Sequence, residues 1–236
     1  MKKKLTAVAL IVALLAVAVI GGSLAYFTDE TDTAVNTFTV GKVKIDLDEA
    51  KVNENGEPVK GENVVQDPKD ADRVIENTYD LMPGLTYTKD PTVTVEKGSR
   101  ECYVRAFVTL TNADKFMEVY RAHGMTIDKA LEFFGDYDPA VWEAQNLNAS
   151  AFDGTTITVE FRYVGPKSTD GVIARDDAND TVLEPIITSV TLPNWVTNED
   201  AAKFPDGFQV NVVAQAIQAA GFDDADAAWA AFDAEP

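Results

Sequence analysis

Apolar and polar side chains alternate along much of the chain, and this period of two restricts the possible folds. Residues 156–164 show it most clearly, because Ile157, Val159, Phe161 and Tyr163 share one parity and polar residues stand between them. Such a period places every second side chain on the same face of a β-strand. The alternating segments are 93–95, 102–110, 156–164, 182–192 and 208–216.

The segments between these runs are turns rather than crossover helices. Gly, Pro, Asn and Asp are frequent in them, as in 82–84, 96–99 and 205–207. Half-buried strands joined in this way predict a mainly β chain folded as an antiparallel sandwich. Pro185 indicates an edge or a bulge within 182–192, and a change of apolar parity at Gly41 predicts a bulge in the strand 37–49.

A helical pattern interrupts the strands at about 113–146. Apolar residues recur at helical spacing from Phe116 to His123, where Gly124 follows, and again from Ile127 to Phe134, where Thr126 precedes as a possible cap. Asp138-Pro139 predicts a third short turn that carries Val141 and Trp142. We expect an insertion that covers one end of the sandwich.

Two further regions depart from the alternation. Asp223 and Asp224 predict the start of a C-terminal helix, whose apolar stripe should pack on the domain. This stripe consists of Ala225, Ala228, Trp229 and Phe232. Segment 50–78 is polar and acidic, which favours an exposed excursion with a turn at Asn55-Gly56.

The first 25 residues have the pattern of a signal peptide. Three lysines precede an apolar run from Leu5 to Ile20, and Ser23 and Ala25 are small residues at the −3 and −1 positions of a cleavage site. We therefore predict cleavage between Ala25 and Tyr26, which leaves residues 26–236 as a single β-sandwich domain. The run is shorter than the ~20 residues of a typical membrane span. An uncleaved anchor is the alternative.

The remaining chain is strongly acidic. The sequence has 20 Lys and Arg against 39 Asp and Glu, a formal charge of −19. Removal of residues 1–25 takes away three lysines and no acid, so the charge becomes −22. Such a surface repels nucleic acid and anionic lipid headgroups. We predict neither nucleic-acid binding nor membrane association after cleavage, whereas divalent cations or a basic partner remain possible.

Residues suited to catalysis are scarce. Cys102 is the single cysteine and His123 the single histidine, so the chain can form neither an internal disulfide nor the His-Glu-x-x-His set of a zinc peptidase. Cys102 shares the apolar parity of its strand, which indicates a buried thiol, and His123 lies on an apolar helix stripe. We predict no cofactor, no catalytic site and no enzymatic activity.

Two acidic clusters are candidates for calcium. One contains Asp170, Asp176, Asp177, Asn179 and Asp180, and Asp136 and Asp138 form the other. Calcium requires oxygens that converge on one point, and neither cluster has the spacing of an EF-hand loop. A solvated acidic loop is the favoured interpretation, and weak calcium binding is the alternative.

Three stretches resemble the TasA/camelysin family of exported proteins of Gram-positive bacteria, whose signal peptides are cut by a SipW-type peptidase. They are GGSLAYFTDETDTAVNTFTVGKVKIDLDE at the start, LMPGLTYTKDPTVTVEKGSRECYVRAFVTLTN in the middle and VVAQAIQAAGFDDADAAWAAF at the end. The resemblance implies a jelly-roll-like β-sandwich, secreted to the cell surface or extracellular matrix, where family members form biofilm fibres. Partners would then be further copies of the chain, sister matrix subunits and, during export, the signal peptidase. Some relatives carry a metallo-endopeptidase name, but this sequence has no zinc motif to receive it.

The segment after the cleavage site has two interpretations. Tyr26 and Phe27 are followed by the polar stretch 28–33, a short extended tail with an aromatic tip. The tail either folds back as an edge strand of its own domain or adds a strand to a neighbouring subunit, with Tyr26 and Phe27 as anchors. Fibre subunit is thus the first functional hypothesis. A monomeric surface-binding module, with or without dependence on calcium, is the second, and an endopeptidase is the third.

Overall fold

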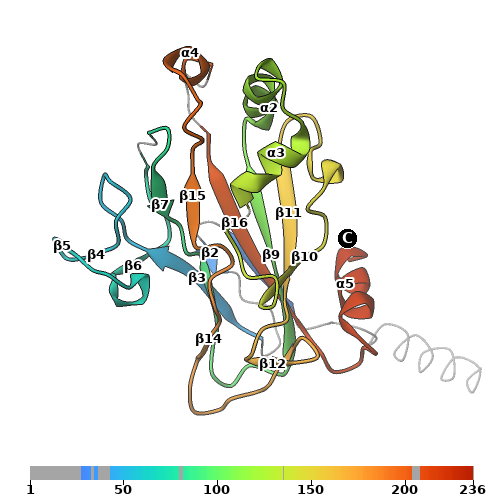
Figure 1. The fold of residues 1–236 in the computed structure, drawn as a ribbon. Helices are drawn as coiled ribbons and strands as arrows, with labels where there is room; N and C mark the ends of the chain where they lie inside the picture. Colours follow the sequence, from blue (N-terminus) through green and yellow to red (C-terminus); the bar gives the residue numbers. More distant parts are fainter. Residues whose placement is uncertain are drawn as a thin grey trace, which may run out of the picture.

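The computed structural model describes residues 28–32, 35–36, 43–79, 82–134, 136–203 and 208–235. Within these ranges the chain is mainly β, with antiparallel strand pairs and a few helices (Figure 1). The predicted fold class, including the helical insertion and the short C-terminal helix, is confirmed. The jelly-roll strand order stays a prediction.

The larger sheet has eight strands in the order β10-β11-β9-β16-β1-β2, with β12 and β13 attached beside β9. Its centre is β9, which pairs with β16 over nine register positions and with β11 over six. The strands are β1 (Thr28–Asp32), β2 (Val35–Asn36), β9 (Cys102–Leu110), β10 (Trp142–Ala144), β11 (Ile157–Tyr163), β12 (Ser168–Thr169), β13 (Val172–Ile173) and β16 (Val210–Gln218).

The smaller sheet has the order β14-β8-β3-β6, and two further strand pairs extend from it. Pair β7–β15 lies toward the helical end of the molecule, and pair β4–β5 projects away from the large sheet (Figure 1). The strands are β3 (Ile45–Ala50), β4 (Val59–Lys60), β5 (Asn63–Val64), β6 (Arg73–Val74), β7 (Thr86–Thr88), β8 (Thr92–Val95), β14 (Thr181–Val182) and β15 (Ser189–Thr191).

The helices occupy two places. Figure 1 shows α2, α3 and α4 at one end of the large sheet, while α5 lies apart from them along its side. The helices are α2 (Ala113–Ala122), α3 (Ile127–Leu131), α4 (Asn198–Ala201) and α5 (Ala225–Asp233), with short 3-10 turns η1 (Pro68–Asp70), η2 (Glu132–Phe134) and η3 (Ala149–Ala151).

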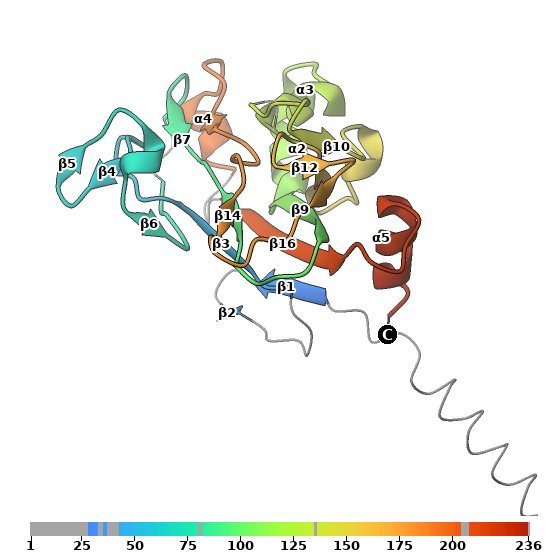
Figure 2. The same ribbon diagram turned by 90° about the horizontal axis from the view of Figure 1, so that it is seen from below.

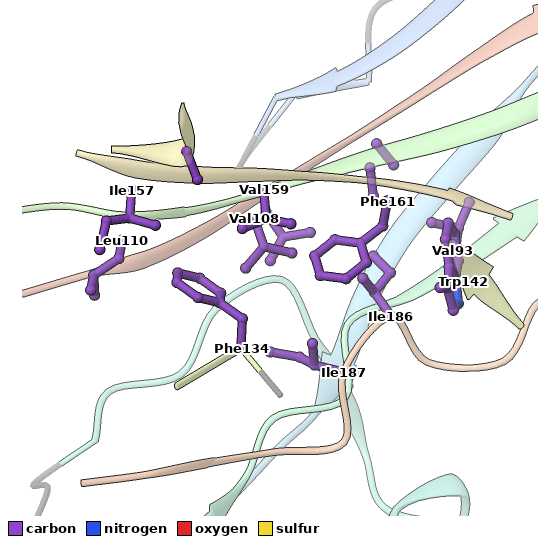
Figure 3. Close-up of a cluster of buried hydrophobic side chains, with 14 of the residues drawn as sticks. Val93, Val108, Leu110, Phe134, Trp142, Ile157, Val159, Phe161, Ile186 and Ile187 are labelled. Carbon is purple, nitrogen blue, oxygen red and sulfur yellow. The ribbon is translucent and has the colours of Figure 1, made fainter. Parts of the chain in front are cut away.

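Side chains from both sheets and from the insertion form one main core (Figure 3). The odd-numbered residues of β11 are buried and the even-numbered ones partly exposed, as its alternation predicts. Phe134 from η2 and Ile186 and Ile187 from the segment before β15 close the core on the side that faces away from β11 (Figure 3). Burial of apolar area against both faces is the main stabilising contribution to such a fold.

The helical insertion is shorter than predicted. Residues 138–141 form a turn in which Asp138 Oδ1 accepts a hydrogen bond from the Ala140 N–H at 2.9 Å, but Trp142 begins strand β10 and pairs with Tyr163. The N–H groups of Val141 and Trp142 both bond to the Asp138 carbonyl at 2.9 Å, so the predicted third turn forms, but it stops at Trp142, which is fully buried in β10. Thr126 does stand at the N-cap of α3, without a side-chain cap hydrogen bond.

Segment 182–192 was also predicted too simply. It contains two short strands in different strand pairs, β14 before Pro185 and β15 after it. Ile186 and Val190 are buried, but Val182 is 50% exposed. The residues that share this parity in the sequence therefore do not all face the core. The bulge predicted at Gly41 lies outside the described residues.

Candidate functional site

Strand β1 lies on the outer side of β16 (Figure 2). Three register pairs join the two strands: Thr28 with Ile217, Asp29 with Ala216 and Glu30 with Gln215. Thr31 and Asp32 then pair with β2. Residues 28–32 therefore add a strand to the large sheet of their own chain, which is the first of the two arrangements considered for this tail.

The sequence of β1 does not explain this strand by itself. It reads TDETD, with acidic residues at three of five positions. Aspartate is depleted in strands, and although its two threonines favour them, β1 has no apolar or aromatic residue. Residues 28–30 are extended where they pair with β16.

Strand β16, the acceptor of β1, is firmly built into the fold. All nine of its residues are in register with β9. Ala214, Ala216 and Ile217 are fully buried, and Ala214 and Ala216 belong to the main core. Strand β1 pairs with only three of these nine residues. Strand β16 is therefore held in place mainly by its longer pairing with β9.

Helix α5 covers the outer face of the sheet next to this edge. Trp229 and Ala228 pack with Tyr103 and Ile217 in a second apolar cluster. Asp224 caps the helix by accepting a hydrogen bond from the Ala227 N–H at 2.8 Å, as its position in the sequence predicted. The expected packing of the C-terminal stripe on the domain is confirmed.

Arg105 of β9 is the polar centre of this contact. Its guanidinium lies 4.3 Å from the Trp229 ring and donates from Nε to Gln215 Oε1 at 2.7 Å and from Nη1 to Asp233 Oδ2 at 3.0 Å. Hydrogen bonding from Arg105 holds the pKa of Asp233 below its usual range. Arg105 was not identified from the sequence, although a charged residue within a strongly apolar strand is a signal that could have found it.

The predicted site residues Ala25, Tyr26 and Phe27 lie outside the described residues. They directly precede Thr28, the first residue of β1. The cleavage site and the two aromatic anchors therefore stay predictions.

His123 and Cys102 take part in packing and local bonding. His123 Nε2 lies 3.0 Å from Asp200 Oδ2, the carboxylate that closes a capping box with Thr197 at the start of α4. The His123 ring also packs on Trp195, with centroids 4.7 Å apart. Cys102 is fully buried, and burial raises the pKa of its thiol to about 12, so the thiolate that binds metals or attacks substrates is suppressed.

Carboxylates in both acidic clusters accept hydrogen bonds from other groups of the chain. Asp176 Oδ1 accepts hydrogen bonds from the N–H groups of Ala178 and Asn179, and Asp180 Oδ1 accepts one from the Lys97 N–H. Asp136 accepts hydrogen bonds from the hydroxyls of Thr188 and Ser189. Across the part of the chain that the structure describes, no three His, Cys, Asp or Glu side chains are grouped to hold a metal ion.

Within the described ranges, none of the helices has the length and apolar character needed to cross a membrane.

Comparison with known families gives one result. Residues 1–93 match the sequence model of a family described as camelysin metallo-endopeptidase. No curated protein and no solved structure matches the chain significantly.

The name of this family implies a metal, and the residues do not fit one. The single histidine is hydrogen-bonded to a capping carboxylate and the single cysteine is fully buried, so neither offers part of a nitrogen and sulfur ligand set. The match does agree with the resemblance found in the sequence. Residues 1–93 are therefore similar to the camelysin family, to which the three stretches of the sequence also point.

Proposed function

We propose that this chain is a secreted structural protein of a Gram-positive-type bacterium, a subunit of extracellular matrix fibres that assembles through its mature N-terminal segment. The family match supports the coarser part of this proposal, a member of a group of exported proteins. The finer part, assembly, is argued from β1.

The observation that carries the proposal is the short ladder between β1 and β16. The main-chain hydrogen bonds of a strand ladder can form equally well to a second copy of the acceptor strand. Register pairs such as Asp29 with Ala216 would then form between neighbouring subunits. Each subunit would donate one strand and accept one, and head-to-tail repetition of that contact gives an open filament.

Export would control the donation of β1 from one subunit to the next. While residues 1–25 are attached, the segment that contains Tyr26 and Phe27 is not a free N-terminus, so subunits would not polymerise inside the cell. After cleavage, Tyr26 and Phe27 would be side-chain anchors in addition to the main-chain bonds. The charge of −22 opposes close packing, so salt, lower pH or divalent cations should promote assembly.

The test compares three purified proteins by light scattering and electron microscopy. They are the chain that begins at Tyr26, the chain that begins at Val35, and the chain with Tyr26→Ser and Phe27→Ser. We expect filaments from the first, none from the second and fewer from the third. Equal filaments from the chain that begins at Val35 would refute donation of β1. An absence of filaments from all three would favour the monomeric surface-binding module.

The family name favours endopeptidase as a second candidate. Casein cleavage by the pure protein, sensitive to a chelator and lost in His123→Ala, would establish it. We expect no such cleavage, because His123 bonds to Asp200 and packs on Trp195.

A further inference from the structure

Three side chains away from β1 form a largely buried polar cluster. Glu49 is at the end of β3, Asn77 follows β6, and Lys89 comes directly after β7. Glu49 and Lys89 have side chains only 5% and 10% exposed, and Asn77 is partly buried beside them. A buried lysine and glutamate are rare unless they are paired, so their contacts indicate what they do.

The carboxylate of Glu49 binds the other two side chains at once. Lys89 Nζ donates to Glu49 Oε2 at 2.5 Å, and Asn77 Nδ2 donates to Glu49 Oε1 at 2.8 Å. The amine of Lys89 and the carboxamide of Asn77 are therefore neighbours on the two oxygens of one carboxylate. An amine, a carboxamide and a bridging carboxylate are the groups needed to make an amide bond with release of ammonia.

The carboxamide of Asn77 is also oriented and polarised by the main chain. Its Oδ1 accepts a hydrogen bond from the Val52 N–H at 3.0 Å, and its Nδ2 donates a second bond to the Ala50 carbonyl at 2.9 Å. These two bonds fix which end of the amide is oxygen. A backbone N–H on the oxygen stabilises the negative charge that develops there when a nucleophile attacks the carbon.

Aromatic side chains shield the same place from water. The Tyr79 ring lies 5.9 Å from Lys89 Nζ and packs edge-on against the fully buried Tyr87. Burial, with the nearby Glu49 carboxylate, raises the pKa of the Tyr79 hydroxyl, which donates a hydrogen bond to the Thr88 carbonyl.

We propose that Lys89 and Asn77 join in an intramolecular isopeptide bond, with Glu49 as the proton carrier. Lys89 Nζ first gives a proton to Glu49 and then attacks Cγ of Asn77, so that a new C–N bond forms. Glu49 delivers a proton to Nδ2, the Cγ–Nδ2 bond breaks, and ammonia leaves. Two protons depart from Lys89 in all and leave with the Asn77 nitrogen as ammonium, so no oxidant or other co-reactant is required.

The bond would give an exported chain a covalent link that its cysteine content cannot provide. One cysteine excludes an internal disulfide, and a link from residue 77 to residue 89 closes the chain around β7. The link forms within one subunit, so it does not depend on fibre assembly.

Peptide mapping of the full-length chain, purified after export, tests the proposal. Without the bond, trypsin cuts after Lys89 and yields peptides 74–89 and 90–97. With the bond, cleavage after Lys89 is blocked, and one peptide 74–97 is recovered, lighter than its sequence by the mass of one ammonia. The readout does not depend on where the N-terminus is processed.

Variants separate the isopeptide bond from a succinimide at Asn77, which also releases ammonia. Lys89→Arg, Asn77→Ala and Glu49→Gln should each abolish the blocked peptide and the mass loss. Lys129→Arg, at an exposed lysine paired with Glu132, should leave both unchanged. Normal cleavage after Lys89 at full mass in the unaltered chain would overturn the proposal. So would an ammonia loss that persists in Lys89→Arg, and the unaltered chain decides even if a variant fails to fold.

Discussion

The centre and the edge of the large sheet are held together by different interactions. Strands β9, β11 and β16 pair over long registers and bury apolar side chains on the core face. Strand β1 pairs with β16 at three positions and consists of threonine and acidic residues. The centre therefore specifies the fold by side-chain packing, whereas the short β1 ladder could be formed by any equivalent strand. A strand of the second kind is suited to exchange between subunits.

The largest expected effect comes from the centre. Phe161→Ala removes a fully buried ring that packs against Tyr137, with centroids 5.1 Å apart. We expect a loss of about 3–5 kcal/mol in the free energy of unfolding, measured with urea, because the cavity cannot be refilled. Glu30→Gln in β1 is the control and should change this free energy by less than about 0.5 kcal/mol. Equal losses for the two variants would remove the distinction between centre and edge.

A smaller effect should come from the contact between α5 and the sheet. Arg105→Ala removes the hydrogen bonds to Gln215 and Asp233 and the stacking on Trp229. We expect the free energy of unfolding to fall by about 1–3 kcal/mol, and the chain beyond residue 218 to be cut faster by proteases. Arg105→Lys should rescue this only in part, because an ammonium cannot bind a carboxylate with two parallel hydrogen bonds. If α5 is as resistant to proteolysis in Arg105→Ala as in the unaltered chain, the apolar cluster around Trp229 alone holds this helix on the sheet.

Removal of β1 should affect stability even less. The chain that begins at Val35 loses the three-position ladder between β1 and β16. The free energy that this ladder contributes to stability is largely offset by the conformational entropy lost when residues 28–32 become ordered. We expect a change of about 1 kcal/mol or less in the free energy of unfolding. A loss as large as that of Phe161→Ala would make β1 an integral part of the subunit and would argue against its exchange.

Acid should reveal a local effect at α4 that is separate from assembly. Hydrogen bonds from Thr197 and then from His123 lower the pKa of Asp200 to about 2. Because the folded-state pKa is lowered, this stabilisation is complete above the pKa of an unfolded aspartate, about 4, and is lost as the pH falls through about 2. The difference in unfolding free energy between the unaltered chain and Asp200→Asn should therefore be constant above pH 4 and shrink toward pH 2. A difference that does not change with pH would contradict this assignment.

The sequence predicted the centre of the fold better than its edge. The alternation in 102–110 and 156–164 located β9 and β11 to within one residue, because a period of two reports directly which side chains face a core. The turn predicted over Val141 and Trp142 forms, but the strand that starts at Trp142 was not predicted, because its extended backbone comes from pairing with Tyr163 rather than from local sequence. The same reason left the fate of β1 open, since nothing local to TDETD selects one acceptor over another.

The partners of the buried charges could not be predicted for a related reason. Glu49 and Lys89 resemble solvent-facing residues in the sequence, and only the tertiary fold brings them together with Asn77. Arg105 stands out within its apolar strand, but its contact with Asp233 also appears only in the fold. The position of Cys102 was predictable, because it shared the parity of a long apolar strand and its burial follows from that parity.

Reversible locking of β1 to its own acceptor tests the exchange of this strand most directly. Asp29 and Ala216 are register partners, so Asp29→Cys with Ala216→Cys in one chain that begins at Tyr26 should form a disulfide across the two strands. Cys102 is fully buried and should not compete, and the chain with Cys102 alone is the control under the same oxidant. We predict that the oxidised double variant stays monomeric by light scattering and that reduction restores filaments. Filaments that form equally well while the disulfide is intact would contradict assembly by exchange of β1.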